Sequence, residues 1–507
     1  MTIAAAASGL TGALAQAVTG PAAANGAYAF TAQLAIGGGE RDCSAVLVDP
    51  LWVLTDSNCF ADKPGAAVAA GKPKLKTTAT VGRTDLNAKD GHSLDVTELV
   101  PNPDRGLVMA RLSAPATGVA PVALADSAPT NGEILKTAGF GRTETEWIPD
   151  KLHTAAFAVG AVAEPAVSLS GKTKDDAICK GDAGGPVLRE RAGRTELVAL
   201  SSASNFQGCL GETKGDAPSL ASATRTDGAA DWIQQVRLSA LVPDVTSVMT
   251  TGDFNGDGRT DIAAVTKDGN LHAFYGRADG TFQYGRPLWT LDGSWKSATK
   301  IIGGDFNGDG HTDIAAVWSN GSLRLYAADV NGNLTANKPM WVDEETNWND
   351  MIHLARFNNG TSNRDGLLAV WGGGPKGALY AYEAGPSGAL TGTKRNMWRD
   401  ATWQYAKKIT TGDFNGDGRD DVVTITDVGG LSRYTRYDSN AGGGLSDGVS
   451  MWRDNSWGAT QVLLSGDFDG DSNTDIGSLW SNQQRFNFYK GDGKGNLAEG
   501  ANAWPRL

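Results

Sequence analysis

The stretch GDFNGDGRTDIAAV, residues 252–265, recurs with small changes along the second half of the chain. Further copies read GDFNGDGHTDIAAV from Gly304, GDFNGDGRDDVVTI from Gly412 and GDFDGDSNTDIGSL from Gly466, and a degenerate copy, ARFNNGTSNRDGLLAV, starts at Ala355. The copies follow one another at intervals of about 50 to 57 residues. A nearly constant period of this kind indicates repeated units that bury their cores against their neighbours.

Strand-like runs follow the repeated stretch, for example residues 262–265 and 271–275. Glycine, with 66 residues, has nearly twice its usual share of about 7%, which favours turn-rich β structure over helices. Five copies, each followed by short strands, predict a β-propeller of five four-stranded blades over residues 240–507.

The repeated loop carries oxygen-bearing side chains at alternate positions. In the first copy Asp253, Asn255 and Asp257 would converge on one point, Arg259 can offer its carbonyl oxygen, and Asp261 closes the set. Hard oxygen ligands at this spacing suit Ca²⁺. The corresponding sets are Asp305, Asn307, Asp309, His311 and Asp313; Asp413, Asn415, Asp417, Arg419 and Asp421; and Asp467, Asp469, Asp471, Asn473 and Asp475.

We therefore expect about four calcium sites with a mainly structural role. The loops are not EF-hands, because no glutamate occupies the twelfth position. The degenerate copy has Arg356 and Gly360 at ligand positions and is expected to bind no metal. The alternative is a set of solvated carboxylates without an ion.

Tryptophan also recurs with the repeat. Of the 15 tryptophans, most lie in the second half as pairs ahead of the next repeat: Trp289/Trp295, Trp341/Trp348, Trp398/Trp403 and Trp452/Trp457. Aromatic faces at repeated rim positions suit stacking on sugar rings, and several weak sites on one rigid body gain avidity. The alternative is packing between blades, and we expect one tryptophan of each pair to be core.

The composition limits other classes of function. The formal net charge of −12 argues against binding nucleic acid through its phosphates, and no apolar run within the folded part is long enough to predict insertion into a membrane. Four bound Ca²⁺ ions would offset much of the negative charge.

The first half contains three landmarks of a different kind. They are WVLTDSNCF from Trp52, DRGLVMARL from Asp104 and CKGDAGGP from Cys179. These segments resemble the regions around the catalytic histidine, aspartate and serine of trypsin-like serine proteases. The resemblance covers about residues 26–238 and implies a double β-barrel, so that the whole chain is expected to be all-β.

The resemblance places Asn58, Gly106 and Ala183 at the three catalytic positions. An amide, a glycine and a methyl group supply neither a nucleophile nor a base, so we expect no enzyme activity. An error in aligning the motifs, which is easiest at Gly106, would leave open the alternative of a secreted serine protease.

Cysteine usage points to an oxidising compartment. The resemblance implies two disulfides, Cys43–Cys59 and Cys179–Cys209, and together they use all four cysteines. We expect a secreted, extracellular protein. Residues 1–25, rich in Ala, Gly and Thr, are interpreted as a leader remnant or a flexible arm.

The repeated loop also resembles the FG-GAP/VCBS family, in which it binds calcium. The combination of an inactive trypsin-like domain with such a propeller resembles the lectin subunit of the umbrella toxin particles of Streptomyces. That resemblance implies a non-catalytic subunit. Its first domain would dock an adaptor subunit that is linked to a large repeat-containing toxin protein, and its propeller would bind a surface glycan of target cells. A calcium-stabilised adhesin that binds protein is the alternative.

Overall fold

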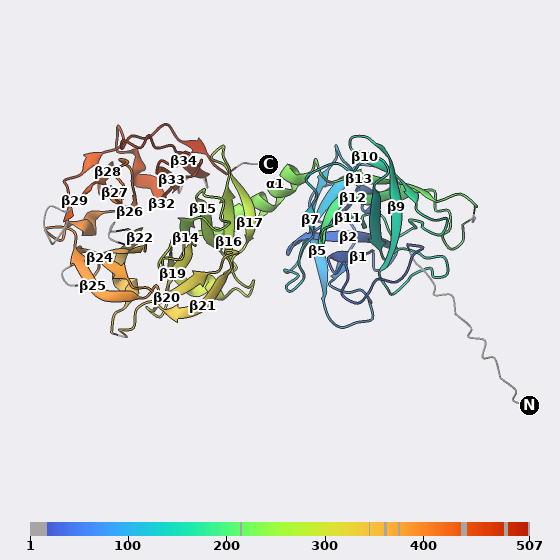
Figure 1. The fold of residues 1–507 in the computed structure, drawn as a ribbon, viewed down its shortest axis with the longest axis horizontal. Coiled ribbons are helices and arrows are strands. Elements are labelled where there is room, and N and C mark those ends of the chain that lie inside the picture. The colour runs from blue at the N-terminus through green and yellow to red at the C-terminus, as the bar shows by residue number, and fades with distance from the viewer. Residues whose placement is uncertain are drawn as a thin grey trace, which may run out of the picture. The chain divides into compact units, whose positions relative to one another are not determined.

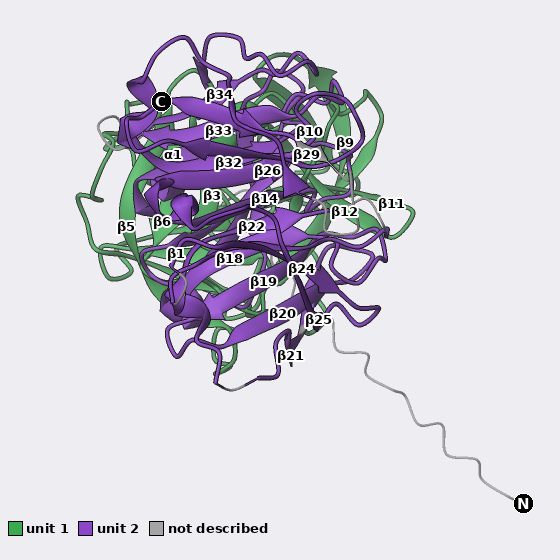
Figure 2. Ribbon diagram, turned by 90° about the vertical axis from the view of Figure 1, so that its left-hand side faces the viewer, with its two compact units in different colours: residues 1–236 green, residues 237–507 purple. Residues whose placement is uncertain are grey.

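The computed structural model describes residues 18–212, 215–343, 345–358, 362–373, 376–437, 444–480 and 485–504. The chain forms two compact units, residues 1–236 and 237–507, shown in separate colours in Figure 2. Both consist mainly of antiparallel strands, and the described residues contain one α-helix, α1 (Ala230–Leu241).

The first unit begins with a closed six-stranded barrel of order β1-β2-β3-β6-β5-β4. Its strands are β1 (Thr31–Ile36), β2 (Arg41–Asp49), β3 (Trp52–Asp56), β4 (Thr77–Val81), β5 (His92–Asn102) and β6 (Leu107–Leu112). Alternate residues of β1, Ala32, Leu34 and Ile36, are at most 2% exposed, which is the period expected for strands with one face in the core.

The second barrel is a ring of six strands. A two-residue strand, β7 (Ala123–Leu124), pairs with one of them at the edge. Its strands are β8 (Ile134–Gly139), β9 (His153–Val162), β10 (Ala166–Gly171), β11 (Pro186–Arg191), β12 (Arg194–Ser204) and β13 (Leu220–Arg225). The ring closes because β11 pairs with both β8 and β12. Phe157, Leu169 and Val198 belong to its core.

Both predicted disulfides are present. Cys43 is bonded to Cys59 in the first barrel, and Cys179 is bonded to Cys209 in the second. The first bond closes a span of 16 residues and the second a span of 30, so each removes chain entropy from the unfolded state.

Residues 18–25 differ from the sequence-based interpretation. Val18 and Thr19 are 1% and 2% exposed, the Thr19 N–H donates to Ala177 O (3.1 Å), and Ala22 forms a β-bridge with His153. This segment packs on the second barrel because it completes backbone hydrogen bonds there, so a leader or arm that extends to residue 25 is too long.

The second unit contains five four-stranded sheets in sequence order (Figure 1). The first three are β14 (Val245–Gly252), β15 (Asp261–Thr266), β16 (Leu271–Gly276) and β17 (Phe282–Pro287); β18 (Ala298–Gly304), β19 (Asp313–Trp318), β20 (Leu323–Ala328) and β21 (Leu334–Pro339); and β22 (Met351–Phe357), β23 (Gly366–Trp371), β24 (Leu379–Ala384) and β25 (Leu390–Asn396).

The fourth and fifth sheets are β26 (Lys408–Gly412), β27 (Asp421–Ile425), β28 (Leu431–Tyr434) and β31 (Val449–Ser450); and β32 (Thr460–Gly466), β33 (Asp475–Trp480), β34 (Arg485–Tyr489) and β35 (Ala501–Asn502). A short hairpin, β29 (Arg436–Tyr437) with β30 (Gly444–Leu445), extends the fourth. The fold class is confirmed: the chain is all-β, with a trypsin-like double barrel and a five-bladed propeller.

The ring of blades closes between the fifth and the first. Thr251 Oγ1 donates to Ser465 O (2.8 Å), and the Thr260 N–H donates to Asp467 O (2.8 Å). Trp504 lies in the same cluster, with its ring centroid 5.9 Å from that of Phe274. Aromatic and hydrogen-bonded contacts therefore join the last blade to the first.

Candidate functional site

Asn58, Gly106 and Ala183, which the resemblance places at the three catalytic positions, all lie in the described part of the first unit. Asn58 lies in the 3₁₀ turn η1 (Ser57–Cys59), directly after β3. Gly106 immediately precedes β6, and its carbonyl accepts a hydrogen bond from the Ser57 N–H (2.9 Å). Ala183 packs against the core of the first barrel, and Cys59 Sγ lies 3.5 Å from its carbonyl oxygen.

A carboxylate that the sequence analysis missed lies at the same place. Asp56 is 1% exposed and pairs across the sheet with Leu107, next to Gly106. One of its oxygens accepts from the Asn58 N–H (2.9 Å), and the other is 3.5 Å from Thr224 Oγ1. Burial raises the pKa of Asp56, although hydrogen bonds from Asn58, Ser202 and Thr224 oppose the shift.

The side chain of Asn58 points its amide oxygen elsewhere. Asn58 Oδ1 accepts from the Gly65 N–H (3.1 Å), so it serves a turn of the following loop. The site as a whole offers one buried carboxylate, one amide and a methyl group. Hydrolysis of the trypsin type needs a hydroxyl and an imidazole at these positions.

Asp182, beside Ala183, is a second buried carboxylate. It is 1% exposed and accepts from the backbone N–H groups of Gly141 and Cys179, each at 2.8 Å. Burial raises its pKa to about 7, against these two hydrogen bonds. Within the described residues it forms no ion pair with a basic side chain.

The predicted metal ligands of the propeller lie in the loops between the first and second strands of each blade. Asp253 Oδ1 accepts from the Gly256 N–H (2.7 Å), and Oδ2 accepts from the Gly258 N–H (2.8 Å). Gly256 and Gly258 have φ of 77° and 82°, in the left-handed region that glycine adopts without strain. In blades 2, 4 and 5, Asp305, Asp413 and Asp467 accept the equivalent backbone N–H hydrogen bonds.

The last carboxylate of the loop is buried at the first residue of the second strand. Asp261 is fully buried, and its two oxygens accept from the N–H groups of Phe254 (2.8 Å) and Gly276 (2.9 Å). Burial, with some contribution from the nearby charges of Asp253 and Asp257, raises its pKa to about 7. A carboxylate in this position would be stabilised as an anion by a nearby cation.

Basic side chains contact some of these loops. Lys490 Nζ lies 2.8 Å from Asp471 in blade 5, and Arg433 lies 3.3 Å from Asp421 in blade 4. Arg433 is only 14% exposed, whereas Lys490 is 47% exposed and has room to move. In blade 5, carboxylate oxygens of Asp467, Asp469 and Asp475 lie within 4.8 Å of one another. The all-oxygen donor set and this clustering fit a hard divalent cation.

The degenerate loop of blade 3 has a different register from the one predicted. Gly252 pairs with Asp261 in blade 1, and Phe357 pairs with Gly366 in blade 3, so both loops have the same length. Glycine, not Asp365, therefore stands at the position of Asp261. The placement of Arg356 at a ligand position is wrong, because Arg356 lies within β22. Gly360 lies outside the described residues.

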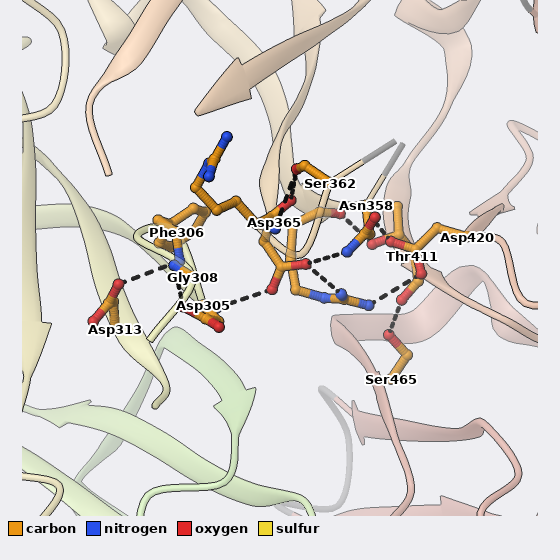
Figure 3. Close-up of polar contacts among 12 residues, drawn as sticks. Asp305, Phe306, Gly308, Asp313, Asn358, Ser362, Asp365, Thr411, Asp420 and Ser465 are labelled. Carbon is orange, nitrogen blue, oxygen red and sulfur yellow. Dashed lines mark hydrogen bonds and ion pairs between the residues drawn. The ribbon is translucent and has the colours of Figure 1, made fainter. Parts of the chain in front are cut away.

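Arg356 is instead the centre of an ion-pair network between blades. Its partners Asp365 and Asp420 are labelled in Figure 3. Its guanidinium contacts Asp365 of its own blade (2.9 Å) and Asp420 of blade 4 (3.2 Å). Asp365 also accepts from the Asp305 N–H of blade 2 (2.9 Å), and Asp420 accepts from the Asn358 N–H (2.6 Å). The charges of Asp420 and Asp365 raise the pKa of Arg356. The guanidinium thus joins blades 3 and 4, and Asp365 extends the network to blade 2.

The tryptophan pairs divide into a buried and a partly exposed member. The second of each pair, Trp295, Trp348, Trp403 or Trp457, is at most 5% exposed and lies in a 3₁₀ turn. The first of each pair, Trp289, Trp341, Trp398 or Trp452, is only partly buried and packs edge-to-face on its partner. Each buried tryptophan also packs on a tyrosine of the next blade; for example, the ring centroids of Trp295 and Tyr326 are 4.8 Å apart.

Pockets open beside two of these pairs. The pocket beside Trp289 has a volume of about 450 Å³, and Trp318, Asn320, Arg324 and Asn337 are among its lining residues. A second pocket, of about 230 Å³, lies beside Trp398 and includes Tyr405 and Asp427. Aromatic faces next to hydrogen-bonding side chains can hold a sugar ring.

Comparisons with known proteins agree with this division of the chain. Residues 17–233 match the family model for trypsin, and residues 253–316 match the model for the FG-GAP-like repeat. Among solved structures, neuropsin, a serine protease expressed in the limbic system of mouse brain, is 21% identical with a TM-score of 0.34. The match covers 43% of this chain and 98% of that chain.

No described helix is long and apolar enough to cross a membrane.

The Arg356 network leads to a stability prediction. Changing Arg356 to Met leaves Asp365 and Asp420 close together without their cation, and we expect a loss of about 3 kcal/mol in the unfolding free energy of the propeller. Adding Asp365→Asn and Asp420→Thr to Arg356→Met should restore most of the lost unfolding free energy. Denaturant unfolding of the full chain measures both effects.

Arg399→Met is the matched control. Arg399 pairs with Asp447, and both side chains are well exposed, at 65% and 83%, so we expect a loss below about 1 kcal/mol. Equal losses for Arg356→Met and Arg399→Met would contradict a special role for the network.

Proposed function

We propose that this chain is a secreted, non-catalytic binding protein. The trypsin-like unit holds a partner protein without cutting it, and the propeller binds calcium and a glycan on a target-cell surface. The observation that carries the proposal is the composition of the former catalytic site: Asn58, Gly106 and Ala183 contribute no attacking oxygen and no base. The two disulfides support secretion.

The identity of the partner follows from the resemblance to the lectin subunit of the umbrella toxin particles. On that basis the first unit docks an adaptor subunit, which links it to a large repeat-containing toxin protein. A trypsin-type double barrel retains strand edges with which an extended peptide can pair, and this is a suitable mode for holding a partner segment.

Calcium is proposed as a structural ion of blades 1, 2, 4 and 5. In blade 1 the ligands would be the side chains of Asp253, Asn255, Asp257 and Asp261, with the carbonyl of Arg259. The ion would offset the charge of the buried Asp261, which already fixes the backbone of β16 through Gly276. Blade 4 should bind most weakly because the poorly exposed Arg433 already contacts Asp421.

Glycan binding is proposed at the partly exposed tryptophans. The rings of Trp289 and Trp398 are held edge-to-face by Trp295 and Trp403, so they are oriented before a ligand binds. Repetition of the pair around the propeller would let several weak sites act together on a surface that carries many copies of one sugar.

The first prediction of this proposal concerns catalysis and partners. Purified full-length protein should not react with a serine-hydrolase probe and should not turn over a peptide ester, because no hydroxyl occupies position 183. The tagged chain, recovered from its culture fluid, should carry its two co-secreted partners. Ester turnover that is lost in Asp56→Asn but kept in Asp62→Asn would contradict the non-catalytic assignment, since Asp62 is an exposed partner of Lys74.

The second prediction concerns metal removal. At roughly 1 mM calcium, each site with a dissociation constant of 10⁻⁴ to 10⁻³ M should stabilise the propeller by about 0.4 to 1.4 kcal/mol. Chelation should therefore lower its unfolding temperature. Asp475→Asn should remove one ion from the bound stoichiometry measured by calorimetry, whereas Asp427→Asn, at an exposed turn, should remove none. Unfolding temperatures that do not respond to calcium would refute the role.

The third prediction concerns sugar binding. Screening the full chain on a glycan array should identify a saccharide whose apparent affinity falls about tenfold or more in Trp289→Ala or Trp398→Ala, as expected for losing about 1.4 kcal/mol of stacking. Trp147→Ala is the control, because Trp147 is 57% exposed but belongs to the first unit. Binding to protein but to no saccharide would favour the adhesin alternative.

A further inference from the structure

The centre of the propeller contains a cavity that the tryptophan pairs do not line. Asp305 and His311 of the blade 2 loop and Arg356 with Asp365 are among its lining residues, but most of the lining comes from other residues. The cavity is lined by residues of the first strand of every blade, β14, β18, β22, β26 and β32. Figure 1 labels β14, β22, β26 and β32 toward the middle of the propeller. Its volume is about 560 Å³, which is within the range of small-molecule sites.

Three basic side chains line this cavity at one level. Lys300, His353 and Lys408 belong to the first strands of blades 2, 3 and 4. Each pairs with the equivalent residue of the second strand, Val317, Val370 and Ile425 respectively. The same register on three successive blades places these groups on neighbouring parts of one wall.

The positive charges of the two lysines act on the imidazole of His353. The charges of Lys408 and Lys300 contribute to lowering the pKa of His353, although burial is the larger cause. Burial also lowers the pKa of both lysines, and only Asp350 opposes this effect at Lys300. His353 donates its Nε2–H to Ala406 O (2.7 Å).

No carboxylate of the described residues forms an ion pair with either lysine. The lysines are half-buried, and each lies in a strand whose neighbours at the same level are apolar or basic. Asp350, beyond ion-pair distance, is the one carboxylate whose charge acts on Lys300, and none of the described carboxylates acts on Lys408. Two half-buried ammonium groups with so little compensation are costly, and this is unusual in a chain of net charge −12.

The opposite part of the wall has a different character. Val462 occupies the equivalent position in blade 5, paired with Leu479, and Val248 of blade 1 also lines the cavity. The cavity at this level is therefore basic on three blades and apolar on two. A ligand with one anionic group and a less polar body would match both sides.

We propose that the central cavity of the propeller binds an oxyanion, a carboxylate or sulfate group, between Lys300 and Lys408, beside the imidazole of His353. The group belongs either to a free inorganic ion or to an acidic sugar. The site is separate from the partly exposed tryptophans, and its occupation does not depend on glycan binding at those positions.

The test uses calorimetric titration of the full chain in 1 mM calcium chloride with sodium sulfate and, separately, with sodium D-glucuronate. Sodium chloride of equal ionic strength and glucose are the reference titrants. We expect saturable binding of one anion per chain. Lys300→Met combined with Lys408→Met should weaken this binding at least tenfold, and Lys300→Arg with Lys408→Arg should retain it.

The matched control is Lys296→Met with Lys407→Met, which removes two exposed lysines from the same part of the sequence. It should leave the affinity unchanged. Binding of glucuronate alone would identify the ligand as a carboxylate-bearing sugar, and equal binding of sulfate would show that an inorganic oxyanion suffices. The proposal fails if neither titrant binds beyond its reference, or if the control pair weakens binding as much as the cavity pair. Loss of sugar-array signal in Trp289→Ala with sulfate binding intact would separate this site from the glycan sites.

Discussion

A buried negative charge at the junction of strands is the constraint on which the propeller depends. Asp261, Asp313, Asp421 and Asp475 are each at most 1% exposed. Three of them, all but Asp421, accept from one N–H of the preceding loop and from one N–H at or just after the end of the third strand. The carboxylate therefore ties three segments of a blade together. It can do so as an anion only where a positive charge lies close, since burial otherwise favours the neutral acid.

Blade 3 meets the same constraint without the carboxylate. Gly366 stands where the other blades have aspartate, and the ring is joined there by Arg356 between Asp365 and Asp420. Asp365 and Asp420 occupy the position that threonine has in the other blades, as in Thr312, whose hydroxyl accepts from the Asp253 N–H. A guanidinium on the chain thus serves where a bound cation is proposed elsewhere, and it spans blades rather than filling a single loop.

Much of this architecture could be predicted from the sequence because it is encoded locally. The number of repeat copies predicts the number of blades and the glycines predict the loop turns, whereas the two disulfide bridges are what the resemblance to trypsin-like proteases implies. The register of blade 3 was predicted wrongly, because the degenerate copy was aligned from Ala355, whereas the strand pairing places Phe357 at the position of Gly252. Asp420 left one signal, an Asp-Asp doublet where other copies read Thr-Asp. The role of Asp56 depends on cross-strand neighbours far away in sequence, and Val18 and Thr19 are buried through backbone hydrogen bonds that composition does not reveal.

The stability of the trypsin-like unit does not depend on the side chains at its three catalytic positions. Its two barrels are held by apolar strand faces and two disulfides, and none of these contributions requires a hydroxyl at 183 or an imidazole at 58. Gly106 supplies a backbone acceptor to Ser57, and Asp56 supplies a carboxylate from the adjoining strand. The buried polar groups thus remain hydrogen-bonded although Asn58, Gly106 and Ala183 stand where trypsin-like proteases have their catalytic residues. A site that stays satisfied in this way costs the fold little, so the stability of the two barrels is compatible with the non-catalytic binding role proposed for this unit.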